Sequence, residues 1–488
     1  MGRYVLGLDG GTGGMRAFVF DANGTPITSA SQTYETSYPQ PGRAEQQPEQ
    51  WLQAVTGSIR QAVRSLDVDE IAGLCAATTS CTVVCCTETG EHLAPAILWM
   101  DVRADGQMRK IKQLTGQSIS AETFLCKALW LKENEPQLWA KTQVLCEYQD
   151  YLNHWLTGEW CFSANTACNW GYNNRKKAFD LDFLRAVGLE DLPDKIPARA
   201  VCAGAPVAPL CTGAAAALGL PPGIPVVQGG IDSSIGMLGM GTVRPGDLSL
   251  MTGSSNLAMA VTERPLFTPP EAVNSGPDFL LPGYYTSVQG QAATGSILRW
   301  FRREFCRDLG MDCLPLLDRA ATAVPPGSNG LLVLDYWQGN RCPYNDPNAA
   351  GTIVGLTMNT SREQIYRAVL EGVAYGTLDV LNTFSNHGHP VERVHISGGF
   401  TRSPVFMQIY ADVCGIPFLV TSDYSVALGS AILTAYALGW YPSIPAAADS
   451  MVHHQTTVYP DAQTHQLYLR QFRRYQRLYR ALKNEQIF

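Results

Sequence analysis

The spacing of apolar and polar residues predicts strands and a helix at the start of the chain. Short apolar runs over 3–34 predict three antiparallel strands in a meander, with Asn23-Gly24 in a tight hairpin turn. Alternation predicts further strands over 71–77 and 83–87. Between the meander and these strands, a helix is predicted over 48–66, because apolar residues recur on one face at Trp51, Val55, Ile59, Val63 and Leu66.

Helical periodicity dominates the next stretch. Residues 105–160 are predicted to be mainly helical, most clearly over 127–134 and 149–156. Prolines punctuate 190–225, which we interpret as loops around a short alanine-rich helix. Glycine and proline cluster again over 239–246, and the boundary between two halves of the chain is expected there.

The second half repeats the alternation of strands and helices. Strands are predicted over 247–261 and a helix over 293–305. A long helix is predicted over 362–385. Ser361 precedes it and Gln364 follows three residues later, which is a capping-box pattern. The arginine-rich segment 463–483 is predicted to be a surface helix rather than a membrane-bound one. Strands alternating with helices indicate an α/β protein.

A glycine-rich turn in the first hairpin carries candidate phosphate chemistry. Asp9 ends an apolar strand, and Gly10-Gly11-Thr12-Gly13-Gly14 leads into the next strand. Glycines allow backbone N–H groups to approach phosphate oxygens, and a carboxylate can hold Mg²⁺ through water. The alternative is an ordinary hairpin with a flexible turn, and this segment alone leaves the two interpretations about even.

A second segment half a chain later has the same design. The apolar segment 247–251 leads into Thr252-Gly253-Ser254-Ser255-Asn256, and 257–261 returns as a strand. Two such turns indicate an internal duplication. Two facing turns of this kind could hold one nucleotide from both sides.

A third glycine turn follows the short strand predicted over 394–397. Gly398 and Gly399 end this strand, and Ser403 is expected to cap a helix whose first residue is Pro404. Adjacent glycines would let a flat base lie against the backbone, at the strand end where nucleotides enter α/β sheets. The alternative is a simple left-handed turn between a strand and a helix.

Asp232 is the candidate general base. It follows Gly229-Gly230 at the end of a predicted strand, near the end of the first half. A sugar hydroxyl has a high pKa, so a positioned carboxylate assists its attack on a γ-phosphate. From the local sequence alone, a helix-capping role for Asp232 is favoured.

An aromatic residue, an acid and a guanidinium lie close together at Trp99, Asp101 and Arg103. A carboxylate and a guanidinium, which form paired hydrogen bonds, suit a polyol-binding pocket when they lie beside an aromatic ring. The alternative is a surface ion pair beside a half-buried tryptophan.

Length and charge narrow the class of protein. The chain has 488 residues, which predicts two large domains, and its net charge of −7 gives no reason to expect nucleic-acid binding. No signal-peptide-like or membrane-spanning stretch is present, so a cytoplasmic protein without membrane association is expected. The 14 cysteines include no C-x-x-C pair, which indicates reduced, mostly buried thiols rather than a zinc site.

Together these motifs resemble the FGGY family of carbohydrate kinases. Residues 351–356, followed by 364–371, fit the C-terminal signature of that family. The N-terminal signature is met in part, by Lys127, Trp130, Leu131, Glu133 and Asn134 but not by Phe124 or Ala128. The segment 339–347 is similar to the ribulokinase-like and ribitol kinase-like branch, and 294–302 to the autoinducer kinases.

The resemblance implies a fold, a cofactor and a site. It implies two actin-like (ribonuclease H-like) α/β domains flanking a deep catalytic cleft, with an N-terminal domain, 1–243, for the sugar and catalytic base and a C-terminal domain, 244–488, for the nucleotide. ATP and Mg²⁺ would be the cofactors, a homodimer is possible, and Asp232 becomes the favoured base. The implied nucleotide-binding residues are Asp9, Gly11, Thr12, Gly13, Gly253, Ser254, Gly398, Gly399 and Ser403. The implied metal ligands are Asp9 and Asp232. The implied sugar-binding residues are Trp99, Asp101, Arg103 and Asp232.

Departures from the family pattern bear on turnover and on the substrate. Gly13 and Gly14 stand where the family often has Ser or Thr, so two hydroxyl donors to phosphate are missing. Asn169 replaces a lysine, and Val288 a glutamate, of the ribulokinase-like sequences. The expected substrate is a pentulose or related polyol such as D-ribulose, xylulose or ribitol. The alternatives are another linear acceptor (erythritol or an autoinducer), a catalytically weak sugar-binding regulator, and an actin-like or chaperone-like ATPase.

Overall fold

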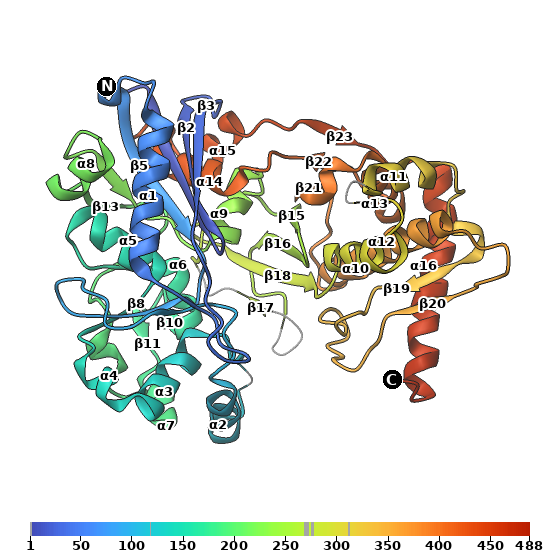
Figure 1. The fold of residues 1–488 in the computed structure, drawn as a ribbon, viewed down its shortest axis with the longest axis horizontal. Helices are drawn as coiled ribbons and strands as arrows, with labels where there is room; N and C mark the ends of the chain where they lie inside the picture. The colour runs from blue at the N-terminus through green and yellow to red at the C-terminus, as the bar shows by residue number, and fades with distance from the viewer. Residues whose placement is uncertain (1, 118, 268–272, 275–277, 311–312) are drawn as a thin grey trace. The chain divides into compact units, whose positions relative to one another are not determined.

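The computed structural model describes residues 2–117, 119–267, 273–274, 278–310 and 313–488 (Figure 1). The chain forms two compact units. Unit 1 is Met1–Val243, Ser275–Tyr285 and Tyr424–Val452, and unit 2 is Arg244–Asn274, Thr286–Asp423 and His453–Phe488. Unit 1 therefore contains a segment, 424–452, that lies in the C-terminal half of the sequence.

The main sheet of unit 1 is mixed, with the strand order β13-β14-β5-β1-β2-β3. β1, β2 and β3 are the predicted antiparallel meander, and β5 runs parallel to β1. A smaller sheet has the order β4-β7-β6-β8. The strands of unit 1 are β1 Tyr4–Gly11, β2 Gly14–Asp21, β3 Pro26–Thr33, β4 Glu45–Gln46, β5 Ile71–Thr78, β6 Val83–Cys86, β7 Ala96–Ile97, β8 Val144–Glu147, β9 Phe162–Ser163, β10 Tyr172–Asn173, β11 Ala178–Phe179, β12 Ala200–Val201, β13 Pro206–Pro209 and β14 Pro225–Val227.

Helices cover both faces of the unit 1 sheet. Leu6 and Leu8 of β1 pack in one core with Trp51 of α1. Gly7 points to the other face, where an added Cβ would lie 2.0 Å from the carbonyl oxygen of Ala427 in α14, so only glycine permits this approach. The helices are α1 Pro48–Val63, α2 Asp105–Thr115, α3 Phe124–Asn134, α4 Pro136–Lys141, α5 Tyr148–Thr157, α6 Ala164–Ala167, α7 Leu181–Val187, α8 Thr212–Leu218, α9 Asp232–Gly239, α14 Ser425–Ala437 and α15 Ile444–Met451.

The sheet of unit 2 has the order β17-β18-β16-β15-β21-β22-β23. β15 pairs antiparallel with β16 and parallel with β21, as β1 does with β2 and β5 in unit 1. The shared order supports the predicted duplication. The strands are β15 Asp247–Thr252, β16 Asn256–Thr262, β17 Val273–Asn274, β18 Tyr285–Gln291, β19 Leu332–Leu334, β20 Thr352–Val354, β21 Arg393–Gly398, β22 Phe418–Val420 and β23 Thr456–Val458.

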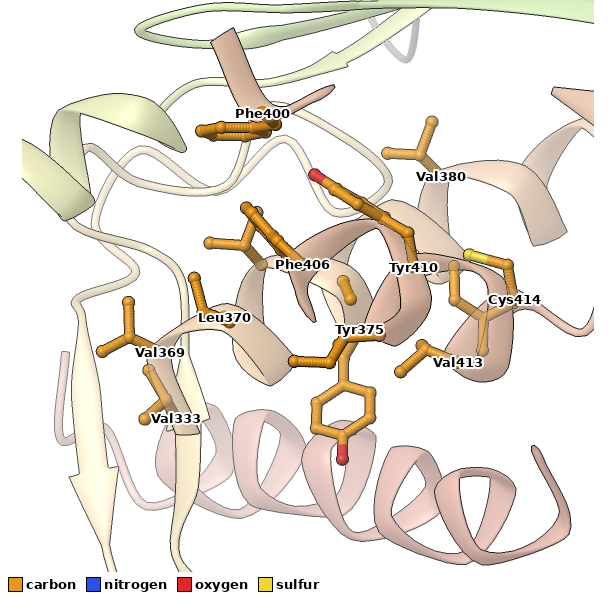
Figure 2. Close-up of a cluster of buried hydrophobic side chains, with 14 of the residues drawn as sticks. Val333, Val369, Leu370, Tyr375, Val380, Phe400, Phe406, Tyr410, Val413 and Cys414 are labelled. Atoms are coloured by element: carbon orange, nitrogen blue, oxygen red, sulfur yellow. The ribbon is translucent and has the colours of Figure 1, made fainter. Parts of the chain in front are cut away.

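The core of unit 2 is built around the long helix α12. Figure 2 shows Val369, Leu370 and Tyr375 of this helix beside Phe406 and Tyr410 of α13. The predicted capping box at Ser361 and Gln364 is present, with both reciprocal hydrogen bonds. The helices of unit 2 are α10 Gly295–Phe305, α11 Cys313–Thr322, α12 Arg362–Asn386, α13 Pro404–Cys414 and α16 Ala462–Asn484.

Three sequence predictions need correction or completion. Residues 105–160 are not helical throughout, because β8 lies among the helices and pairs with β6. The predicted helix over 48–66 ends at Val63, so Leu66 lies beyond it. The predicted terminal helix is α16, and its aromatic residues Tyr468, Phe472, Tyr475 and Tyr479 are buried in the core of unit 2. Among the described residues, no helix is both long and apolar enough to cross a membrane, and the cysteines there are free thiols.

Candidate active site

The first glycine-rich turn joins β1 to β2 in unit 1. Asp9 lies near the end of β1 with only 3% of its surface exposed. The hairpin register places Asp9 opposite Arg16, whose guanidinium forms an ion pair with the carboxylate. Burial raises the pKa of Asp9, and Arg16 opposes this shift. Arg16 was not singled out in the sequence, although a two-residue hairpin turn would have predicted this cross-strand pair.

The backbone of this turn is held by buried side chains. The Tyr34 hydroxyl lies within hydrogen-bond distance of the carbonyls of Gly11 and Gly14, which share its single proton. The Gln46 amide donates to the Thr12 carbonyl at 2.7 Å, and its own oxygen accepts a hydrogen bond from Trp51 at 2.8 Å. These contacts argue against a loosely held turn. Tyr34 and Gln46 were missed in the sequence analysis, because no local pattern connects them to residues 11–14.

The two glycines that follow Thr12 differ in the space that they leave for a side chain. A Cβ added at Gly13 would meet nothing within 4 Å. A Cβ at Gly14 would lie 2.5 Å from the carbonyl oxygen of Gln32 on β3. Backbone packing therefore requires glycine at position 14, whereas position 13 has room for a side chain.

Asp232 is the first residue of α9. The residue before it, Ile231, bridges to Thr78 at the end of β5. Asp232 therefore lies at the same sheet edge as Asp9, where the parallel strands β1, β5 and β14 end. The N-cap position is Ile231 and has no side-chain cap, so Asp232 is not the helix cap that the local sequence favoured.

Burial raises the pKa of Asp232 to about 7, and the neighbouring charge of Asp9 adds to this shift. Its Oδ1 accepts a hydrogen bond of 2.6 Å from the backbone N–H of Ser233. A carboxylate with such a pKa can exchange a proton near neutral pH. The structure thus brings a buried carboxylate, Asp9, and a half-buried one, Asp232, to the same strand ends.

These two carboxylates suit a divalent cation that is shared with phosphate. In the described part of the chain, no group of three or more metal-ligating side chains occurs. Mg²⁺ is commonly held by one or two carboxylates, with water and substrate phosphate as the other ligands. The carboxylates of Asp9 and Asp232 fit that donor set, and a cation would reduce the repulsion between them.

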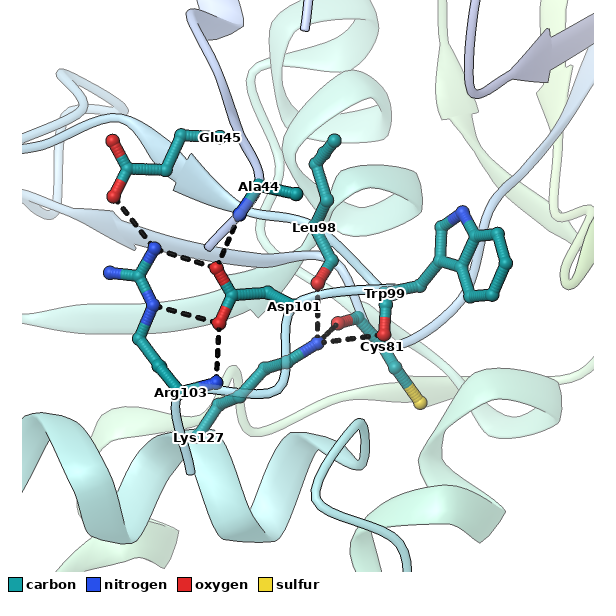
Figure 3. Close-up of polar contacts among 8 residues, drawn as sticks. All are labelled: Ala44, Glu45, Cys81, Leu98, Trp99, Asp101, Arg103 and Lys127. Carbon is teal, nitrogen blue, oxygen red and sulfur yellow. Dashed lines mark hydrogen bonds and ion pairs between the residues drawn. The ribbon is translucent and has the colours of Figure 1, made fainter. Parts of the chain in front are cut away.

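Asp101 and Arg103 form a buried ion pair (Figure 3). The Asp101 carboxylate is fully buried and accepts hydrogen bonds from the Arg103 side chain and from the backbone N–H groups of Arg103 and Ala44. Burial alone would raise the pKa of Asp101, but these hydrogen bonds bring it below its usual value. Arg103 also pairs with Glu45 at 2.7 Å. These contacts favour a structural role for Asp101 and Arg103, which supports the turn that carries Trp99.

Lys127 is buried behind the same turn (Figure 3). Its ammonium donates to the carbonyls of Cys81, Leu98 and Trp99, at 2.8, 2.6 and 3.3 Å. Burial lowers the pKa of Lys127 to about 8, and nearby acidic groups oppose this shift. The sequence marked Lys127 only as a match to the family pattern, and the structure explains that match by these three backbone contacts.

In unit 2, the turn at Gly253 and Ser254 packs against the start of α10. The N–H groups of Thr294 and Gly295 donate to the carbonyls of Ser254 and Gly253, at 2.9 and 3.0 Å. The Arg299 guanidinium donates to the Ser254 hydroxyl at 2.8 Å. Arg299 thus brings a positive charge to the predicted phosphate turn.

A cavity of about 560 Å³ in unit 2 is lined by four of the five nucleotide residues that were predicted in this unit. Gly253, Ser254, Gly399 and Ser403 line it. Gly398 ends β21, and Ser403 caps α13 as predicted, by accepting the N–H of Phe406. The lining also includes residues that the sequence analysis did not assign to this site, among them Arg302, Asp318, Tyr366, Phe400 and Phe406. The size and the aromatic walls suit a small organic ligand.

The two-unit α/β fold, with glycine-rich turns and carboxylates at the strand ends, is typical of a nucleotide-dependent phosphotransferase, and comparison with known proteins identifies the family. Residues 4–239 match the N-terminal domain, and residues 248–438 the C-terminal domain, of the FGGY family of carbohydrate kinases. The chain belongs to this family. The resemblance inferred from the sequence motifs is therefore confirmed.

Individual relatives act on different sugars according to their names. A ribulokinase of Mycolicibacterium smegmatis is 30% identical over 92% of this chain and 88% of its own length. A gluconokinase of Bacillus subtilis is 29% identical over 92% of this chain and 90% of its own. The crystal structure of xylulose kinase from Rhodospirillum rubrum is 27% identical, covers 99% of both chains and superposes with a TM-score of 0.88. This chain is thus a carbohydrate kinase, a phosphotransferase with an alcohol group as acceptor.

Proposed function

We propose that this chain transfers the γ-phosphate of ATP to a hydroxyl of a pentulose or a related polyol. The observation that carries the proposal is the position of the Asp232 carboxylate, which begins α9 at the same strand ends as the buried Asp9. Two of the three relatives described above are named for pentuloses. A neutral acceptor is favoured because Asn169 and Val288, at the positions that we associate with acceptor choice, carry no charge.

In the proposed mechanism, Asp232 accepts the proton of the acceptor hydroxyl as that oxygen attacks the γ-phosphorus. Asp9 and Asp232 would hold Mg²⁺, which neutralises phosphate charge when it is bound. Thr12 and the backbone N–H groups of 11–13 would donate hydrogen bonds to phosphate oxygens. Gly253, Ser254, Gly398, Gly399 and Ser403 would bind the nucleotide.

The roles of the remaining predicted residues are narrower in this proposal. In the proposal, Trp99 still lies beside the acceptor. Asp101 and Arg103 support the turn that carries Trp99 through their ion pair. The division into a sugar-binding domain, 1–243, and a nucleotide-binding domain, 244–488, is kept as a proposal about function. Residues 424–452 contribute to the fold of unit 1.

The test is a coupled ADP-release assay with Mg²⁺ and ATP against a panel of acceptors. The panel contains pentuloses, pentitols, tetritols, hexuloses, gluconate, glycerol and the linear autoinducer. Turnover with one pentulose or pentitol, lost in Asp232→Asn, supports the proposal, and Asp182→Asn on the surface is a matched control. ATP hydrolysis that ignores every acceptor would favour an actin-like ATPase, and nucleotide binding without turnover would favour a regulatory homologue.

A further inference from the structure

The side chain of Trp99 reaches the phosphate turn of unit 1. Its indole N–H donates to the hydroxyl oxygen of Thr12 at 3.0 Å. Trp99 follows β7, so the contact joins two segments that are far apart in the sequence. The sequence analysis placed Trp99 beside the acceptor and Thr12 beside phosphate, and it did not connect them.

This contact fixes how the Thr12 hydroxyl can be used. An indole N–H is a donor only, so the Thr12 oxygen must act as its acceptor. The hydroxyl proton then points away from the indole and is available to an incoming anion. Residues 10–14 contain no other hydroxyl, because the remaining positions are all glycine.

The Trp99 side chain is partly exposed, and the backbone that carries it is held by a buried scaffold (Figure 3). Lys127 binds the carbonyls of Leu98 and Trp99, and the Asp101–Arg103 pair closes the turn that follows. On the other side of the contact, Gln46 holds the Thr12 carbonyl. The backbone on both sides of the hydrogen bond is therefore fixed by contacts that do not depend on a ligand.

We infer that Trp99 is a positioning residue that orients the Thr12 hydroxyl toward a phosphate of bound ATP. This inference rests on the proposed function, since it requires that the turn at 11–14 binds phosphate. One oriented hydroxyl offsets part of the loss of donors at Gly13 and Gly14. The same contact links the turn that carries the acceptor-side tryptophan to the turn that binds phosphate.

The first measurement asks whether the hydrogen bond exists in solution, without nucleotide. In protein labelled with ¹⁵N at tryptophan, Trp99→Phe identifies the Trp99 indole N–H resonance by its loss. Thr12→Val should move that resonance upfield and speed its exchange with water. An unchanged resonance in Thr12→Val would overturn the inference.

The second measurement is a double-mutant cycle on the affinity for a non-hydrolysable ATP analogue with Mg²⁺, by calorimetry. Trp99→Phe should weaken binding about 3- to 10-fold, which is the range for one hydrogen bond. In a Thr12→Val background, Trp99→Phe should have no further effect. Independent, additive losses would show that Trp99 acts by another route.

Controls separate this inference from the proposed function and from misfolding. Trp160→Phe is the matched variant, because Trp160 also donates its indole N–H, to the Glu88 carbonyl at 2.7 Å, and it should retain full affinity. Unchanged melting temperatures would exclude misfolding of the variants. If the unaltered protein binds no nucleotide, the proposed function fails; if it binds and the cycle is additive, only the role of Trp99 fails.

Discussion

At the scale of single residues, the neighbouring carboxylates Asp9 and Asp232 lower the stability of the folded state. Burial raises the pKa of both groups, so the folded state resists their ionisation. A carboxylate whose pKa is raised by folding contributes stability at low pH, and this contribution is lost as the pH rises through the folded pKa. For Asp232 this loss begins at about pH 4, the ordinary pKa of an aspartate, and is complete above about pH 7.

We therefore expect Asp232→Asn to have opposite effects on activity and stability. Acceptor-dependent turnover should fall about 100- to 10,000-fold, as for loss of a general base. The melting temperature should rise by a few degrees at about pH 8, and this gain should vanish at about pH 3, where the carboxyl is protonated in both states. Melting curves across this pH range measure it, and a gain that is equal at every pH would contradict the assignment.

The two glycines after Thr12 should respond differently to the same substitution. Gly13→Ser places a hydroxyl in open space and should tighten binding of Mg²⁺ with an ATP analogue about 2- to 10-fold. Gly14→Ser would press a side chain against the backbone of β3 and should lower the melting temperature. Calorimetry and thermal melting of both variants test this pair. Weaker binding by Gly13→Ser would mean that the turn does not face phosphate.

At the scale of secondary-structure elements, the family signature on α12 is explained by structure. Arg367 and Glu371 form a buried ion pair at 2.9 Å. The Glu371 carboxylate also accepts hydrogen bonds from Ser328, from the backbone of Gly327 and from Tyr468 on α16. This part of the signature therefore ties α12 to α16 and to the loop before β19, rather than lining the cavity.

Removing the charge of Glu371 should destabilise unit 2. Glu371→Gln leaves the buried Arg367 without its counter-charge, which typically costs about 3–5 kcal/mol. Urea denaturation followed by tryptophan fluorescence should show a lower midpoint. The matched control is Asp182→Asn, which breaks an exposed pair with Arg185 and should leave the midpoint unchanged. A Glu371→Gln variant as stable as the control would contradict this role.

The sequence predicted elements well where the signal was local. The meander, the capping box of α12 and the Ser403 cap of α13 depend on periodicity and on residues a few positions apart. β8 was missed because it is short and buried on both faces, so it lacks alternation. The residues that support the glycine-rich turn at 10–14, which are Tyr34, Gln46 and Trp99, were not predicted as such because their contacts span long sequence distances.

At the scale of the whole molecule, the two units repeat one sheet topology. The pairing of β15 with β16 and β21 matches that of β1 with β2 and β5. The sequence indicated this duplication through its two glycine turns. It did not indicate that α14 and α15 return to unit 1, because their amino acids suit any buried helix.

The first half of the chain should therefore not fold by itself. Fragment 1–243 lacks α14, which packs on β1 and approaches α9 so closely that a Cβ at Gly429 would lie 1.9 Å from the Ile235 carbonyl oxygen. We expect this fragment to aggregate, whereas 1–243 joined to 424–452 by a flexible linker should show more native-like circular dichroism and solubility. A cooperative melt of 1–243 alone would contradict this expectation.

The return of α14 to β1 also orders events during synthesis on the ribosome. The Ser430 hydroxyl of α14 donates to the carbonyl of Leu8 in β1. β1 is synthesised early, but it can be packed only after α14 has been synthesised. Until that helix emerges, the nascent chain presents an uncovered apolar sheet face. Chaperones that hold such surfaces would be needed longest for this unit, although its first residues leave the ribosome early.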